Sequence, residues 1–182
     1  SGYSESESIL NEWNYVCGWS GEGWKKSLAT ELSIKGAAFI AAVATACQHE
    51  KLDMLMYYDA RINSTMNGLF RPGTLEVRKG YYPLKIWGEM LSSDGECETS
   101  CDIPDIYAVS AVKDGASVTM ITYYSDDDEA LPRTFTVELS GDVLRTVYLL
   151  DSTHDMTACE TIAPDCGSFR LTMQPNTVVV IR

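Results

Sequence analysis

The pattern of apolar and polar positions divides the chain into two parts: the first alternates strand-like and helix-like runs, and the second contains only short extended runs. In residues 1–92, two short and almost continuously apolar runs at 8–11 and 53–58 alternate with two longer runs of helical character at 29–49 and 79–91. Continuous apolar strands are typical of parallel strands that are covered on both faces. The order strand, helix, strand, helix therefore predicts a βαβ unit with one extra helix.

Short extended runs fill the second part of the chain. Residues 93–104, "SDGECETSCDIP", form a polar linker that contains Gly and Pro. Turn signals such as "KDG" and "SGD" separate the runs that follow. These runs cover residues 106–112, 117–124, 133–139, 144–151, 157–162, 169–173 and 177–182. About seven short strands with tight turns predict an antiparallel β-sandwich over residues 105–182.

The first part is too small to close a sheet on itself. A (β/α)8 barrel takes about 250 residues, and residues 1–92 provide only two β/α units. A two-stranded parallel sheet would leave both edges without hydrogen-bond partners. We therefore predict the last two β/α units of a (β/α)8 TIM barrel, an incomplete catalytic domain, with the sandwich as an accessory domain. We expect these unpaired edges to make the chain associate with itself or with the missing barrel portion.

Composition and charge narrow the classes of partner. The 182 residues are 45% hydrophobic and 22% charged, values ordinary for a soluble globular protein. A formal net charge of -12 disfavours binding to nucleic acid and to anionic membranes. The longest apolar run, residues 36–47, is shorter than the roughly 20 residues that span a bilayer. Cytoplasmic and secreted locations both remain open.

Neither the cysteines nor the histidines predict a metal site or a cofactor. The spacing of the six cysteines matches no zinc signature, and both histidines are isolated in the sequence. "CETSC" allows a small disulfide loop in an exported protein, although reduced thiols without a catalytic role are favoured. The acidic run 126–129 has the oxygen ligands that calcium needs, but without EF-hand spacing a solvated loop is the preferred interpretation. The cysteines are Cys17, Cys47, Cys97, Cys101, Cys159 and Cys166.

Two carboxylates follow the two predicted strands. Functional residues of a barrel lie at the carboxyl ends of its strands; Glu12 follows the first strand and Asp59 follows the second. Nearby aromatic residues suit a sugar site, because a pyranose stacks its apolar face on a ring while acids bind its hydroxyls. The alternatives are a solvated charge at Glu12, an ion pair of Asp59 with Arg61, and an aromatic cover for the barrel end. The aromatic residues are Trp13, Tyr15, Trp19, Trp24, Tyr57 and Tyr58.

Five ordered segments resemble a known group of enzymes. "LNEWNYV", "KGAAFIAAVATACQ", "LDMLMYYDAR", "MNGLF" and "KGYYPLKIW" resemble the last two β/α units of clan A retaining glycoside hydrolases, most nearly family 39, the β-xylosidase and α-iduronidase type. The resemblance implies a carbohydrate substrate, with a xyloside as the best guess, and no cofactor or metal. It makes Glu12 the catalytic nucleophile. The residues then expected to bind substrate are Asn11, Trp13, Tyr15, Trp19, Tyr58, Asp59 and Arg61.

One part of the catalytic pair is missing. In the clan, the acid/base residue belongs to an Asn-Glu pair at the end of the fourth barrel strand, and here the only "NE" is Asn11-Glu12. Asp59 is the nearest substitute. We expect the chain alone to be inactive, as a C-terminal fragment of a retaining glycosidase. The alternative is a non-catalytic carbohydrate-binding or structural β-sandwich module.

Overall fold

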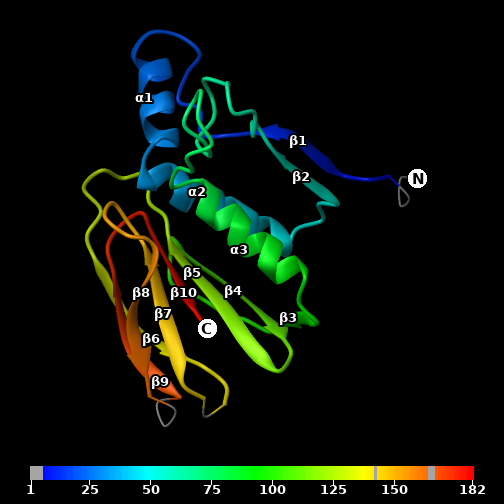
Figure 1. Cartoon of the computed structure of the whole chain (residues 1–182), viewed down its shortest axis with the longest axis vertical. Helices are drawn as coiled ribbons and strands as arrows, with labels where there is room; N and C mark the ends of the chain where they lie inside the picture. Colours follow the sequence, from blue (N-terminus) through cyan, green and yellow to red (C-terminus); the bar gives the residue numbers. More distant parts are fainter. Residues whose placement is uncertain (1–5, 142, 164–166) are drawn as a thin grey trace.

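The first part of the chain forms a small parallel sheet covered by helices. The structure is a computed structural model that describes residues 6–141, 143–163 and 167–182. Two strands pair in parallel, and Figure 1 shows a loop leading from the end of each strand to the next helix. The elements are β1 (Ile9–Trp13), α1 (Gly21–Glu31), α2 (Ile34–Gln48), β2 (Met54–Tyr57) and α3 (Tyr81–Leu91). The predicted alternation of strands and helices is confirmed.

The single helix predicted over residues 29–49 is wrong in extent. The chain forms α1 and α2 instead, bent by 79° where they meet, and α1 begins at Gly21, eight residues before the predicted start. Ser33 caps α2 by accepting a hydrogen bond from the Lys35 N–H. A Cβ on Gly36 would lie 2.5 Å from the Thr30 carbonyl oxygen, so only glycine allows the two helices to approach this closely.

The second part of the chain, the β region (residues 95–181), contains all seven predicted strands and one more. Six strands form one antiparallel sheet in the order β3-β4-β5-β10-β7-β8, and β6 pairs with β9 in a second. The extra strand, β3, lies in the segment predicted to be a polar linker. The strands are β3 (Gly95–Cys97), β4 (Ile106–Lys113), β5 (Ala116–Tyr123), β6 (Arg133–Glu138), β7 (Arg145–Leu150), β8 (Asp155–Ile162), β9 (Ser168–Met173) and β10 (Thr177–Ile181).

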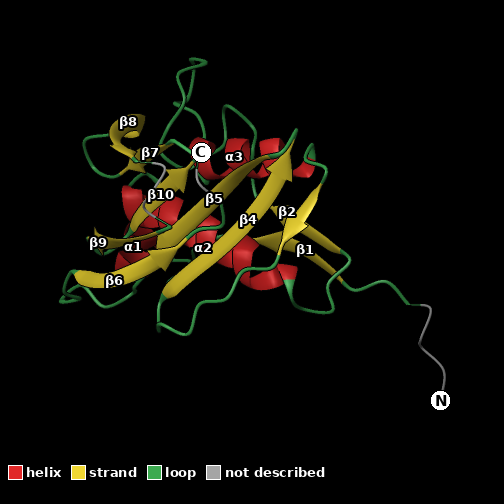
Figure 2. Ribbon diagram, turned by 90° about the horizontal axis from the view of Figure 1, so that it is seen from below, coloured by secondary structure: helices red, strands yellow, loops and turns green. Residues whose placement is uncertain are grey.

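Helix α2 is buried between the two parts. Ile40 packs with Trp13 of β1 on one side, while Ala38 and Ala41 pack against the six-stranded sheet on the other. Viewed from below in Figure 2, β4 and β5 cross in front of α2. Helix α2 is thus buried on more than one side. The α/β part and the β region therefore share one core.

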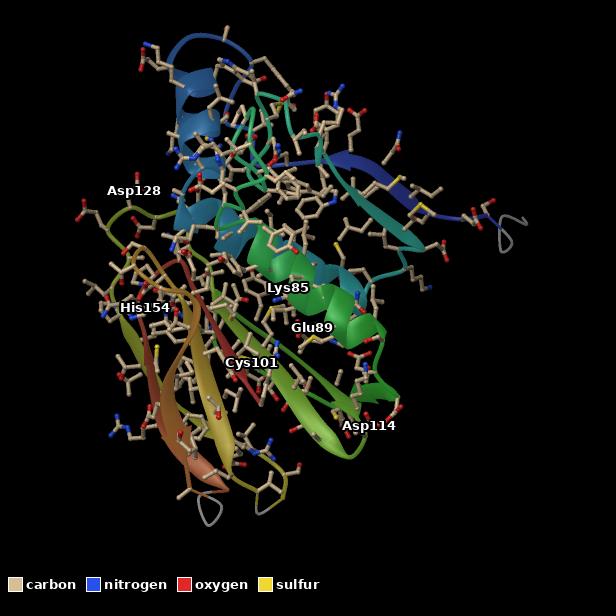
Figure 3. The ribbon with its side chains drawn as sticks, viewed as in Figure 1. Lys85, Glu89, Cys101, Asp114, Asp128 and His154 are labelled. Carbon is tan, nitrogen blue, oxygen red and sulfur yellow. The ribbon has the colours of Figure 1, made fainter. Side chains whose placement is uncertain are left out.

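Ion pairs join the two parts at the edges of this core. Lys35 Nζ lies 3.0 Å from both Asp126 and Asp128, and Lys79 Nζ lies 2.6 Å from Asp155. Arg182 at the chain end pairs with Glu89 of α3, and Figure 3 labels Glu89 on this helix. The acidic run 126–129 was predicted to be a solvated loop, and its four residues are exposed and lie outside the strands; the carboxylates of Asp126 and Asp128 also pair with Lys35 of α2.

One face of the β1–β2 sheet is open. Leu55 and Tyr57 of β2 pack into the cluster beneath α2, whereas Met54 and Met56 alternate to the opposite face and are each almost half exposed. Ile9 and Leu10 of β1 are exposed to a similar degree. The prediction that these strands are covered on both faces is therefore wrong for the part of the chain that the structure describes.

Among the described residues, none of the helices has by itself the length and apolarity to cross a membrane. Only α1 and α2 together, with their sharp bend, meet that test by length and composition. Five cysteines carry free thiols, including both members of "CETSC", and Cys166 lies outside the described residues.

Candidate functional site

Strand β1 has a bulge at the candidate nucleophile. Leu10 pairs with Leu55 and Trp13 pairs with Tyr57, so Asn11 and Glu12 together stand opposite the single residue between those partners. That residue is Met56, which lies on the open face of the sheet, away from α2. Bulges are frequent next to active sites because they redirect side chains. Both Asn11 and Glu12 are exposed at this bulge.

Asn14 joins the ends of the two strands. Its amide nitrogen donates to the Tyr58 carbonyl at 2.5 Å and to the Met66 carbonyl at 3.3 Å, while its side-chain oxygen accepts from the Tyr15 N–H at 2.7 Å. The loops that follow β1 and β2 therefore meet at the carboxyl end of the sheet, as Figure 1 shows. Sequence reasoning missed Asn14, because nothing in its local pattern distinguishes it from other loop asparagines.

Asp59, a buried carboxylate after β2, forms an ion pair with the exposed side chain of Arg61. Arg61 donates to it from Nη2 at 2.8 Å, from Nε at 3.1 Å and from its backbone N–H at 2.8 Å. Burial alone would raise the pKa of Asp59, but hydrogen bonds from Arg61 and Ser64 outweigh burial and hold this pKa below its ordinary value. The Tyr58 hydroxyl accepts from Arg61 at 3.1 Å. Asp59 is therefore an ionised carboxylate at neutral pH and is poorly suited to donate a proton.

Trp13 and Tyr15 point into the protein. Trp13 is buried between Phe39 and Tyr57, with ring centroids 6.0 and 5.2 Å away. Tyr15 is also buried, and its hydroxyl donates to Asp126 at 2.6 Å. Both residues were expected to bind substrate, and here they support the loop that would carry such a site.

Trp19 is the aromatic residue of this loop that faces outward. It is 74% exposed, and its ring stacks on Trp24 of α1 with centroids 6.0 Å apart and planes tilted by 24°. Gly18 and Gly23 pass so closely that a Cβ on Gly23 would lie 3.2 Å from the Gly18 Cα. The loop is thereby folded tightly and leaves the outer face of the Trp19 ring open to solvent.

Glu31 is a second carboxyl near Asp59 that sequence reasoning missed. It is only 2% exposed, and neither of its oxygens has a hydrogen-bond partner among the residues that the structure describes. Burial, with a smaller contribution from the charge of Asp59, raises the pKa of Glu31 to about 7. Such a group could hold a proton at neutral pH. Its burial keeps it from contacting a solvent-borne substrate.

A separate cleft of about 940 Å³ lies between the two sheets of the β region. It is lined by the 97–103 segment and by residues of β4, β5 and β6, and none of the predicted site residues borders it. Within residues 6–141, 143–163 and 167–182, no three His, Cys, Asp or Glu side chains gather as a metal site would require.

Solved glycoside hydrolases share this fold. The family 30 subfamily 8 xylanase from Clostridium acetobutylicum aligns with 97% of the chain at 13% identity and a TM-score of 0.66. A GH51 α-L-arabinofuranosidase from Thermotoga petrophila aligns with 96% at 16% identity and 0.66. A GH44 xyloglucanase from Paenibacillus polymyxa aligns with 98% at 15% identity and 0.64. No protein-family model matches the sequence, and no curated protein matches it.

These neighbours are (β/α)8 enzymes of clan A, so the resemblance to that clan is supported at the level of fold. Family 39 is not confirmed. The chain spans 42%, 42% and 32% of these three enzymes, less than half the length of each.

Proposed function

We propose that the chain is the C-terminal part of a retaining glycoside hydrolase and that Glu12 is its nucleophile. The bulge in β1 carries this proposal, because it presents an exposed carboxylate at the carboxyl end of the strand, on the sheet face away from α2. The likeness of nearly the whole chain to part of clan A enzymes supports it. More specifically, we propose that the enzyme acts on a xyloside-type substrate and is of the family 39 type.

In this mechanism Glu12 attacks the anomeric carbon and forms a covalent glycosyl-enzyme. A second carboxylic acid about 5–5.5 Å away protonates the leaving oxygen and then activates water. The ion pair with Arg61 keeps Asp59 deprotonated, which disfavours it as that acid. The acid/base residue would therefore come from a barrel segment outside these 182 residues.

The open face of the β1–β2 sheet fits the same proposal. Ile9, which pairs with Met54, and Met54 and Met56 place exposed apolar side chains on this face. Burying apolar surface is favourable by about 25 cal/mol per Å², so these residues would be stabilised by packing against the other strands of a barrel. Around Glu12, we assign substrate contacts to Asn11 and to the group formed by Tyr58, Asp59 and Arg61.

Replacing Glu12 tests the nucleophile in a longer protein that contains this chain and hydrolyses an aryl glycoside. Glu12→Ala should lower kcat on the order of 10⁴-fold, the scale of losing a group that forms the covalent bond. Azide fits the space of the lost carboxylate and should restore turnover by attacking the anomeric carbon itself, so that the phenol leaves and a glycosyl azide is the product. Glu22→Ala is the matched control, because Glu22 is exposed and pairs with Lys25 at the surface of α1. Near-normal activity of Glu12→Ala would exclude the assignment.

A second candidate function rests on Trp19. An exposed ring with one open face, backed by Trp24, suits stacking on the apolar face of a sugar without any catalysis. In this case the 182-residue chain should bind xylan or xylo-oligosaccharides in titration calorimetry and hydrolyse neither. Trp19→Ala should abolish binding, whereas Leu131→Ala, which removes an equally exposed apolar side chain, should not. Loss of binding in both variants would contradict this function.

A further inference from the structure

The loop that leaves β1 is fixed by the β region as well as by the α/β part. The Tyr15 hydroxyl donates to Asp126 Oδ1 at 2.6 Å, across 111 positions of sequence. Tyr15 follows Asn14, whose side chain accepts from the Tyr15 N–H and donates to the Tyr58 carbonyl. A change at Tyr15 would therefore reach the loops after both strands.

Asp126 is itself held in place by Lys35. The Lys35 ammonium lies 3.0 Å from Asp126 Oδ1 and donates to the Asp126 carbonyl at 3.1 Å. It also pairs with Asp128 at 3.0 Å, which Figure 3 labels on the loop beside the junction of α1 and α2. The hydrogen bond from Tyr15 and the charge of Lys35 hold the pKa of Asp126 below its ordinary value, against the opposing effect of burial. An ionised acceptor makes the Tyr15 hydrogen bond a strong, charge-assisted one.

Aromatic contacts follow the same route between the two parts. Phe39 of α2 contacts Trp13, Tyr15 and Tyr124, with ring centroids 6.0, 5.4 and 5.6 Å away. Tyr124 directly follows β5 and precedes the acidic loop, while Trp13 contacts Tyr57 of β2 at 5.2 Å. Packed rings thus connect the β1–β2 sheet to the strand end that carries Asp126.

We propose that Asp126 is a positioning residue for the candidate glycosidase site. Through Tyr15 it fixes residues 14–19, the loop that leaves β1 directly after Glu12. That the ordered loop serves a glycosidase site rests on the proposed function, but the contact between Tyr15 and Asp126 can be tested without any sugar. The β region would then serve the site by ordering its loop, in addition to covering α2.

Amide hydrogen exchange of the 182-residue chain, measured by NMR, tests this role. The Cys17 N–H donates to Ser27 Oγ, and the Tyr58 N–H donates to the Trp13 carbonyl, so both report on the loop. Tyr15→Phe should speed exchange at both amides by about tenfold, which corresponds to about 1.4 kcal/mol. The Arg78 N–H, bonded to the Leu69 carbonyl, should keep its wild-type rate.

Three further variants separate this contact from general loosening of the acidic loop. Asp126→Ala should speed amide exchange as much as Tyr15→Phe does. Asp126→Asn keeps an acceptor oxygen, so its exchange rates should lie between those of Asp126→Ala and wild type. Asp128→Ala removes a partner of Lys35 without touching Tyr15, so exchange at Cys17 should stay unchanged. The double variant Tyr15→Phe/Asp126→Ala should exchange no faster than either single variant. Equal effects of Asp128→Ala and Asp126→Ala, or additive effects in the double variant, would overturn the proposal.

Sugar binding distinguishes failure of this inference from failure of the proposed function. If the chain binds xylo-oligosaccharide, Tyr15→Phe should weaken binding by about tenfold, the factor expected for 1.4 kcal/mol, and Asp128→Ala should not. Unchanged binding in Tyr15→Phe would overturn the positioning role. If wild type binds no sugar, the second candidate function, direct binding through Trp19, fails, whereas the nucleophile assignment is still tested by Glu12→Ala in the longer protein; the exchange rates alone then decide whether Asp126 orders the loop.

Discussion

Three carboxyl groups near the ends of β1 and β2 have surroundings that suit different chemistry. Glu12 is exposed at a bulge, and its carboxylate accepts no hydrogen bond from the described residues. Asp59 is ionised and already engaged in an ion pair with Arg61. Glu31 is buried without a partner and holds a proton up to about pH 7. Of the three, Glu12 has the surroundings of a nucleophile, because it is open to solvent and not already engaged.

Glu31 predicts a pH dependence of stability. Its pKa rises from an ordinary 4.5 to about 7 in the folded protein. Between these values the folded state keeps a proton that the unfolded state has lost, so stability falls as pH rises from 4.5 to 7 and stays lower above it. The shift corresponds to roughly 3 kcal/mol. Glu31→Gln should remove this slope and be more stable than wild type at pH 8.

Urea unfolding at pH 4.5, 6, 7 and 8, followed by tryptophan fluorescence, measures this difference. Each protein gives a curve of unfolding free energy against pH. Subtracting the wild-type curve from the variant curve removes the contributions of the other carboxyls, which both proteins share. Glu22→Gln is the control, because its side chain is almost fully exposed. Parallel curves for wild type and Glu31→Gln would show that Glu31 titrates normally.

At the scale of elements, sequence patterns predicted the strands well and the first helix poorly. All seven strands predicted in residues 105–182 were found, because a short extended run bounded by turn signals is a local feature that each strand carries itself. The break between α1 and α2 was missed, although Ser33 and Gly36 mark it once its geometry is known. The contact of Tyr15 with Asp126 has no local signal, since its partners are 111 positions apart. The bulge at Glu12 was likewise hidden, because it depends on the register with β2.

Two glycines in helices should respond oppositely to alanine. Alanine in a helix interior is favoured over glycine by about 1 kcal/mol. A Cβ on Gly88 in α3 would meet no described atom within 4 Å outside the backbone of its own helix, so Gly88→Ala should stabilise the protein by about that amount. Gly36→Ala would bring a Cβ to 2.5 Å from the Thr30 carbonyl oxygen and should cost roughly 1–3 kcal/mol despite the gain in propensity. Urea midpoints of both variants check the two signs, and a stabilised Gly36→Ala would mean that the α1–α2 junction relaxes freely.

For the whole molecule, the sequence suggested two domains joined by a linker, whereas the structure shows a shared core. Met120 and Val180 of the six-stranded sheet pack in one cluster with Ala38 and Ala41 of α2 and Ile86 of α3. Two parts that share a buried cluster are expected to unfold together. Sequence reasoning could not predict this cluster, since the apolar faces of α2 and the sheet each look complete by themselves.

The four tryptophans allow a direct test of this shared core. All of them lie in residues 1–92, so tryptophan fluorescence reports on the α/β part, while far-ultraviolet circular dichroism also reports on the strands of the β region. The two signals should give coincident urea transitions. Met120→Ala, at a fully buried position of β5, should lower stability by roughly 2–5 kcal/mol and should shift the fluorescence transition as far as the dichroism transition. Leu131→Ala, at an exposed position of the β region, should shift neither. If Met120→Ala moved only the dichroism signal, the β region would unfold independently, as two domains joined by a linker would.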